Sequence, residues 1–257
     1  MNSTTDTAAC QTDAPAPGAG LAATTLLDFQ HPALQQLRRI RQWDHLPTPE
    51  RIGAVYDFVR NDIRFGYNQS DDLPASRVLA DGYGQCNTKA TLLMALLRAS
   101  GVACRLHGFT IDKQLQLGAI TGLAYWLAPR LILHSWVEVW FNEQWINLEA
   151  FILDQAYLSA LQRRFPGRRA FCGYGVATPD LSDPPVHWQG QSTYIQKEGI
   201  NADLGVFATP DDFYRQFGGN LSGVKRWLFA HLVRHQMNHN VARVRSARQH
   251  GSDAPPL

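Results

Sequence analysis

The stretch Gly82-Tyr-Gly-Gln-Cys86-Asn-Thr-Lys-Ala-Thr-Leu-Leu-Met-Ala-Leu-Leu-Arg98-Ala-Ser-Gly101 decides the fold of this chain. Its first two glycines allow a tight turn, and the residues after Cys86 are strong helix formers uninterrupted by proline. The leucines recur at the spacing of an apolar helix face, and Gly101 is typical of a helix C-terminus. The pattern predicts a buried helix that begins at Cys86.

A cysteine at the start of a helix lies next to unpaired backbone N–H groups and the positive end of the helix dipole. Both favour the thiolate over the thiol, which is how a nucleophilic cysteine is made. A free cysteine is also commonly a small buried hydrophobe. The local sequence leaves both interpretations of Cys86 open, and a nearby base would favour the first.

The candidate base is His134, in a segment that predicts a β-hairpin. Residues 131–141 alternate with the period of a strand, residues 142–144 are typical of a turn, and Trp145 to Ala150 predicts the returning strand. On the second strand the side chains of residues 145, 147 and 149 share a face. Pairing of the strands can bring a carboxylate beside the histidine. Cysteine, histidine and an acid in this chain order suit thiol acyl transfer.

These residues resemble the transglutaminase-like superfamily of cysteine enzymes, which includes peptide N-glycanases and is distantly papain-like. The resemblance covers roughly residues 51–154. The matching motifs are Ala75-Ser76-x-Val78-Leu79, Gly82-x-Gly84-x-Cys86, Leu96-Leu97-Arg98-Ala99-x-Gly101-Val102-x-x-Arg105, His134-x-Trp136-Val137-Glu138-Val139 and Trp145-x-x-x-Glu149.

The resemblance implies roles for three residues. Cys86 is the nucleophile, His134 the general base and acid, and Glu149 the residue that orients His134. The family usually carries aspartate at the third position, so Asn147, two residues earlier on the same strand face, is the alternative orienting residue. Further candidates for substrate contact are Tyr67, Tyr83, Gln85, Trp136 and Asn147.

The fold expected from the resemblance is α+β and papain-like, with the Cys86 helix packed on an antiparallel sheet. The residue pattern itself predicts N-terminal helices and a long C-terminal helix. We expect a disordered tail over residues 1–24, a catalytic core over 25–160, a loop-rich extension over 161–221, the long helix over 222–249 and a tail over 250–257. The extension includes a predicted strand at 193–196. The apolar insertion 114–130 is either a wall or lid of the cleft or a surface loop.

Composition excludes several classes of function. The formal net charge is +2, too small to indicate nucleic-acid or membrane partners, and the scattered cysteines indicate neither a disulfide framework nor a zinc site. The N-terminal residues lack the pattern of a signal peptide, so we expect a cytoplasmic protein. His231, His235 and His239 form a helical stripe without a flanking carboxylate or thiol. We therefore predict no metal and no cofactor.

The sequence thus predicts cysteine-dependent acyl transfer through a thioester on Cys86, with a peptide, amide or thioester as substrate. Hydrolysis, transamidation and cyclisation or amide-bond formation in a biosynthetic pathway remain open. The other hypothesis is a non-catalytic binding module on the same fold. The C-terminal helix is apolar on two sides, which suggests a homodimer. From Lys225 onward the sequence has six Lys or Arg and one acidic residue, so this segment is basic. An acidic carrier protein is therefore a candidate partner.

Overall fold

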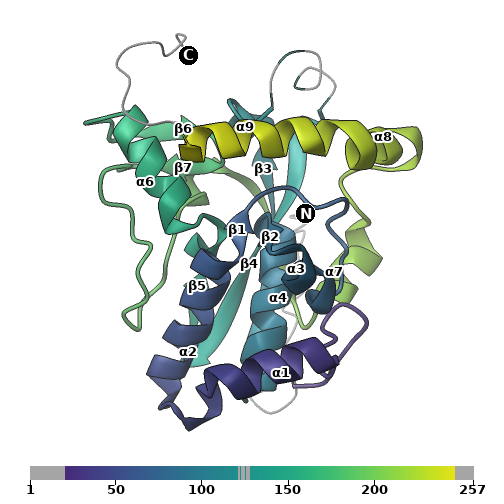
Figure 1. The fold of residues 1–257 in the computed structure, drawn as a ribbon, viewed down its shortest axis with the longest axis vertical. Coiled ribbons are helices and arrows are strands. Elements are labelled where there is room, and N and C mark those ends of the chain that lie inside the picture. Colours follow the sequence, from purple (N-terminus) through teal and green to yellow (C-terminus); the bar gives the residue numbers. More distant parts are fainter. Residues whose placement is uncertain (1–20, 121, 123–124, 126–127, 247–257) are drawn as a thin grey trace, which may run out of the picture.

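A single buried helix lies at the centre of the protein. The computed structural model describes residues 21–120, 122, 125 and 128–246. Helix α4 (Cys86–Ala99) begins at the predicted residue, and every side chain from Asn87 to Arg98 is buried. It packs between the N-terminal helices and a sheet (Figure 1). A helix buried on all sides is fixed in position by its surroundings.

The main sheet has four strands in the order β5-β4-β3-β8, all antiparallel. The apolar side chains that face α4 come from alternate residues of β3 and β4, including Leu106, Val137 and Val139. The strands are β3 (Cys104–Asp112), β4 (Leu131–Phe141), β5 (Gln144–Leu148) and β8 (Ile200–Phe207). The predicted hairpin is therefore present, and its turn residues Asn142 and Glu143 both have positive φ, as tight hairpin turns require.

The extension after the hairpin contains a strand, but not at the residues that the sequence predicts. The expected strand at residues 193–196 is wrong, because that segment forms only an isolated bridge from Thr193 to Leu148. Two of its backbone N–H groups, those of Ile195 and Gln196, donate to the Glu149 carboxylate instead. The strand that extends the sheet is β8, which pairs with β3.

The N-terminal helices cover the side of α4 that faces away from the sheet. They are α1 (Pro32–Arg41), α2 (Thr48–Asp57) and α3 (Ala75–Asp81). Two short strands, β1 (Arg64–Phe65) and β2 (Tyr83–Gly84), pair in parallel just ahead of Cys86. This pairing holds the turn from which α4 starts.

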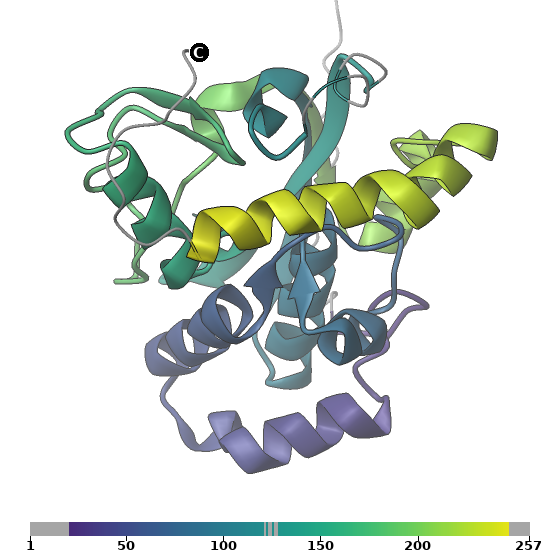
Figure 2. The same ribbon diagram turned by 45° about the horizontal axis from the view of Figure 1, so that its top comes forward.

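The C-terminal helical run crosses the molecule near the start of α4 (Figures 1 and 2). It is divided into α8 (Gly223–Leu228), a π-helical turn η6 (Phe229–Val233) and α9 (Arg234–Ser246), while the predicted end at 249 lies outside the described residues. One face packs through Met237, Val241 and Val244. The opposite face is exposed at Val224, Trp227 and Leu232, so the described part of the chain covers one of the two apolar sides. A contact with a second subunit stays a prediction.

Smaller elements complete the chain. No helix among the described residues combines the length and apolarity needed to cross a bilayer. The remaining elements are α6 (Gln155–Arg164), α7 (Pro210–Phe217), β6 (Phe171–Gly173), β7 (Val176–Thr178), η1 (Trp43–His45), η2 (Phe58–Asp62), η3 (Lys113–Gln116), η4 (Ala150–Ile152) and η5 (Lys197–Gly199).

A buried lysine ties α4 to its surroundings. Lys89 is fully buried, and its Nζ donates to the carbonyl of Arg60 in η2 at 3.2 Å and to the carbonyl of Ile152 in η4 at 2.9 Å. Burial lowers the pKa of this amine well below its usual value. The two carbonyls satisfy the amine, and the bonds hold η2 and η4 against one turn of the helix.

Gly108 offers a test of how tightly α7 packs on the sheet. A Cβ at this position would lie 2.5 Å from the ring of Phe213, which is completely buried. Gly108→Ala should therefore lower the free energy of unfolding by about 1–3 kcal/mol, the usual cost of overpacking a core. Chemical denaturation measures the change. The control is Gly219→Ala, where the added Cβ meets nothing closer than 3.9 Å; an equal effect of both variants would contradict the packing.

Candidate active site

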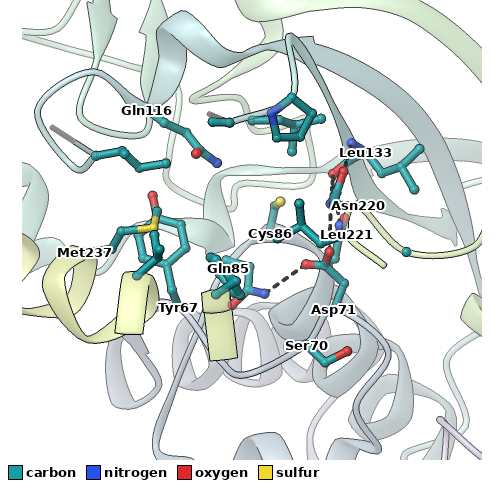
Figure 3. Close-up of a pocket in the computed structure, with 18 of the residues that line it drawn as sticks. Tyr67, Ser70, Asp71, Gln85, Cys86, Gln116, Leu133, Asn220, Leu221 and Met237 are labelled. Carbon is teal, nitrogen blue, oxygen red and sulfur yellow. Dashed lines mark hydrogen bonds between the residues drawn. The ribbon is translucent and has the colours of Figure 1, made fainter. Parts of the chain in front are cut away.

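Cys86 is the first residue of α4, and local hydrogen bonds define the start of this helix. The Gln85 backbone N–H donates to Thr88 Oγ1 at 3.1 Å, which closes the first turn. Gly84 packs so closely on this turn that a Cβ would lie 2.7 Å from the same oxygen. Cys86 is half-buried, and it lies at the wall of a cavity (Figure 3). The thiol is thus placed at a helix N-terminus with access to a hollow in the protein.

His134 and Glu149 form a buried pair on the sheet. Both side chains have no exposed surface, and His134 Nε2 lies 3.2 Å from Glu149 Oε1. Glu149 follows β5 by one residue, on the strand face that the alternation predicts. Its second oxygen, Oε2, accepts from the backbone N–H groups of Ile195 at 2.7 Å and Gln196 at 2.9 Å. The carboxylate is therefore held from two sides, with the imidazole on one oxygen and the two backbone N–H groups on the other.

The imidazole of His134 is stabilised in its protonated form. Burial alone would lower its pKa, but the neighbouring Cys86 thiolate and the Glu149 carboxylate outweigh burial and raise the pKa to about 9. Glu149 occupies Nε2, while the buried Nδ1 has no hydrogen-bond partner of standard geometry among the described residues. Nδ1 is thus the nitrogen left for exchange of a proton with the thiol.

The strand that carries His134 has an open edge, and α4 docks there. β5 pairs with β4 only from Val137 onward, so Leu133 has no strand partner on that side. Two asparagines replace the strand: Asn220 Oδ1 accepts from the Leu133 N–H at 2.6 Å, and Asn87 Nδ2 donates to the Leu133 carbonyl at 3.0 Å. Asn87 Oδ1 also accepts from Ser135 Oγ at 2.9 Å. The residue after Cys86 therefore bonds to both neighbours of His134.

Asp71 provides a second connection between the thiol and the strand. One of its oxygens accepts from Gln85 Nε2 at 2.9 Å and the other from Asn220 Nδ2 at 2.7 Å (Figure 3). Burial raises the pKa of this carboxyl, and the amide hydrogen bonds oppose the rise. Through Asp71 and Asn220, the residue before Cys86 is also joined to Leu133. Sequence reasoning missed Asp71, Asn87 and Asn220.

The cavity beside Cys86 has a volume of about 370 Å³. Its walls come from β1 and the loop after it, from the start of α4, from the region between β3 and β4, and from the C-terminal helical run. Within the insertion 114–130, the described residues Leu115, Gln116, Ile120, Ala128 and Pro129 contribute to the wall. Residues 121, 123–124 and 126–127 lie outside the described part, so a lid function of this insertion stays a prediction.

The structure brings only some of the predicted substrate contacts to the cavity. Tyr67 and Gln85 line it, and burial raises the pKa of Tyr67. Trp136 is buried instead against Phe109, with ring centroids 4.1 Å apart. Trp136 does not line the cavity, and neither do Tyr83 and Asn147.

Tyr83 and Asn147 have other partners. The Tyr83 hydroxyl accepts from Arg234 Nη1 at 3.3 Å. The Asn147 amide donates to the Tyr194 hydroxyl at 2.6 Å rather than to His134, so the position of an orienting residue is occupied by Glu149. Strand alternation predicts the correct face for Asn147, but the register pairs this residue with Glu138, which is four residues along β4 from His134.

No group of three or more His, Cys, Asp or Glu side chains that could hold a metal ion occurs in the part of the chain that the structure describes. Of the C-terminal histidines, His231 donates from Nδ1 to the Trp227 carbonyl at 2.8 Å and stacks on that indole.

Asn87 should prove a positioning residue for the strand that carries His134. Asn87→Ala leaves the Leu133 carbonyl and Ser135 hydroxyl without this partner, at a cost of about 1–3 kcal/mol in unfolding free energy. We also expect slower alkylation of Cys86, since the imidazole is no longer tied to the helix. Ser135→Ala is the matched control, because it removes one of the two bonds and should have the smaller effect on both measurements. Equal alkylation rates in all three proteins would refute the positioning role.

The pKa of His134 also predicts a dependence of stability on pH. A folded-state pKa of about 9, above the ordinary value of 6.5, means that the folded protein binds the proton more tightly than the unfolded chain. The resulting stabilisation is complete below pH 6.5, is lost as pH rises toward 9, and is on the order of 3 kcal/mol. Denaturation of the wild type and His134→Ala across this range should show their difference shrinking with pH. A difference that is constant with pH would contradict a raised pKa.

Comparison with known proteins finds a similarity for the part of the chain that carries these residues. Residues 35–150 match the family model of the transglutaminase-like superfamily. A crystal structure of a "putative cysteine protease" from Cytophaga hutchinsonii is similar with a TM-score of 0.43 and 13% identity, over 75% of this chain and 47% of that one. This chain therefore spans about half the length of that protein. No curated protein sequence matches the chain. Residues 35–150, which carry Cys86, His134 and Glu149, are thus the part of the chain that is similar to the transglutaminase-like superfamily.

Proposed function

We propose that the protein is a cysteine-dependent acyl-transfer enzyme that forms a thioester on Cys86. The observation that carries this proposal is the buried His134–Glu149 pair, 3.2 Å apart, whose remaining ring nitrogen is left for a thiol at a helix N-terminus. A purely structural histidine would have both nitrogens satisfied in the interior. The cavity beside Cys86 supports the proposal, since it provides room for a substrate.

Before the first half of the reaction, the proton of the Cys86 thiol has passed to His134 Nδ1, in keeping with the raised pKa of this imidazole. The thiolate then attacks an amide or thioester carbonyl. The backbone N–H of Cys86, in the first turn of α4, stabilises the oxyanion. As the tetrahedral intermediate collapses, the bond to the leaving group breaks, and the imidazolium gives its proton to the departing nitrogen or sulfur. The acyl group remains on the Cys86 sulfur.

In the second half, His134 removes a proton from the acceptor, which attacks the thioester and releases the thiol. Water as acceptor gives hydrolysis, and an amine gives a new amide. Glu149 holds the imidazole in one orientation for both proton transfers and stabilises its charge. Peptide, amide and thioester donors all suit this sequence of steps, and an acidic carrier protein stays a candidate source of the donor.

A non-catalytic binding module is the competing function. In such a module Cys86 would be an ordinary thiol, and its reactivity would not depend on His134. The hydrogen bonds from Asn87 and Asp71 favour the enzyme, because they tie both neighbours of Cys86 to the strand of His134, which binding alone does not require.

Thiol alkylation separates the two functions. At pH 7, iodoacetamide should modify Cys86 at least roughly tenfold faster than Cys172, which is exposed but has a pKa raised by partial burial and by Asp112. His134→Ala should abolish this advantage, and Glu149→Gln should reduce it. Peptide mapping after timed quenching gives the rates, with Cys172→Ser as control. Equal rates for the two thiols, unchanged by His134→Ala, would favour the binding module.

A further inference from the structure

We infer that the site takes an acyl group with an apolar chain, which lies in the cavity beside Cys86. This inference rests on the proposed function, because it names the class of acyl donor for the same cysteine. The first argument is the chemistry of the walls. Apolar side chains from the region between β3 and β4 face apolar side chains from the C-terminal helical run; they are Ile111, Leu115, Ile120, Ile132, Leu228, Phe229, Val233 and Met237.

The second argument is that several of these wall residues are incompletely buried. Leu228 is 39% exposed, and Phe229 and Val233 are half-buried, although each has a place on a cavity wall. An apolar ligand removes the remaining apolar surface from water, which favours binding by about 25 cal/mol per Å². The same helical run leaves Trp227 and Val224 on its outer side, away from the cavity lining.

The third argument concerns the polar residues of the wall, which bond mainly to one another. Asp71 accepts from Gln85 and Asn220, and Asp72 accepts from Arg226 at 3.2 Å. Gln196 Nε2 donates to the Gly175 carbonyl at 2.6 Å. An extended peptide needs partners for its own N–H and C=O groups. The carboxylates of Asp71 and Asp72 and the Gln196 Nε2 already have partners, and among the described residues the Gln196 Oε1 is a buried polar atom of this wall without one. A hydrocarbon chain needs none.

The volume of the cavity suits such a group. About 370 Å³ lies near the lower end of the range for small-molecule pockets. A chain attached through its carbonyl to the Cys86 sulfur would extend between Ile132 and the C-terminal helical run and fill this space. The chain would also exclude water from around the thioester.

A series of p-nitrophenyl esters tests the inference, from acetate through butyrate and hexanoate to octanoate. The Cys86 thiolate attacks the ester carbonyl, the bond to the aryl oxygen breaks, nitrophenolate leaves, and the acyl group stays on sulfur until water releases it as the acid. We expect kcat/KM to rise about fourfold for each added methylene until the cavity is full. Intact mass should show the acyl adduct on Cys86, and its absence in Cys86→Ser.

Two cavity variants and a matched control make the test specific. Val233→Trp fills the cavity and should lower the ratio of octanoate to acetate kcat/KM at least roughly tenfold. Val224→Trp makes the same change on the exposed side of the same helical run and should leave the ratio unchanged. Phe229→Ala enlarges the cavity and should move the optimum to a longer chain, which tests the inference even if Val233→Trp does not fold.

A binding measurement separates this inference from the proposed function. Calorimetry on Cys86→Ser should show octanoate binding much more tightly than acetate. Adducts that form equally with acetyl and octanoyl groups would overturn the apolar site and leave the acyl transfer standing. Octanoate binding without any adduct in the wild type would overturn the acyl transfer and leave the apolar site standing. Neither binding nor adduct would overturn both.

Discussion

The first turn of α4 is the constraint on which the rest of the site depends. Cys86 carries the thiol, Asn87 bonds to the residues on either side of His134, and Lys89 holds the carbonyl of Ile152, three residues beyond Glu149. One helical turn therefore positions the Cys86 sulfur, strand β4 with His134, and the segment that follows Glu149. Because α4 is buried along its length, this turn cannot shift without disturbing the core.

The buried charges of the site are balanced by short-range contacts rather than by solvent. A carboxylate and an imidazole without exposed surface are costly to bury, and only close partners offset that cost. Glu149 has the imidazole on one oxygen and two backbone N–H groups on the other. Those N–H groups belong to Ile195 and Gln196, outside residues 35–150, which match the transglutaminase-like family model. The extension after the core is thus part of the support of the site.

Much of the fold could be predicted because it follows periodic patterns, and the same patterns place the candidate site residues. The leucine spacing predicted α4, and strand alternation predicted both the hairpin and the face that carries His134 and Glu149. Alternation predicts which face of a strand a side chain lies on, but not its position along the strand. Trp136 and Asn147 therefore lie on the predicted faces without belonging to the site. Asp71 and Asn220 lie in loops, where no period applies, and their roles depend on contacts between distant segments. Residues 193–196 form a bridge at Thr193, but the backbone N–H groups of Ile195 and Gln196 donate to the Glu149 side chain, so the segment does not continue as a strand.

The complete burial of His134 limits how its imidazole can exchange protons with solvent. Glu149 occupies Nε2, the imidazole has no exposed surface, and its Nδ1 is buried without a hydrogen-bond partner among the described residues. Buffer acids and bases therefore have no direct route to the imidazole. For the proposed acyl-transfer reaction, the lifetime of an acyl group on Cys86 would then depend on how readily an acceptor enters the cavity, more than on the basicity of the surrounding solution.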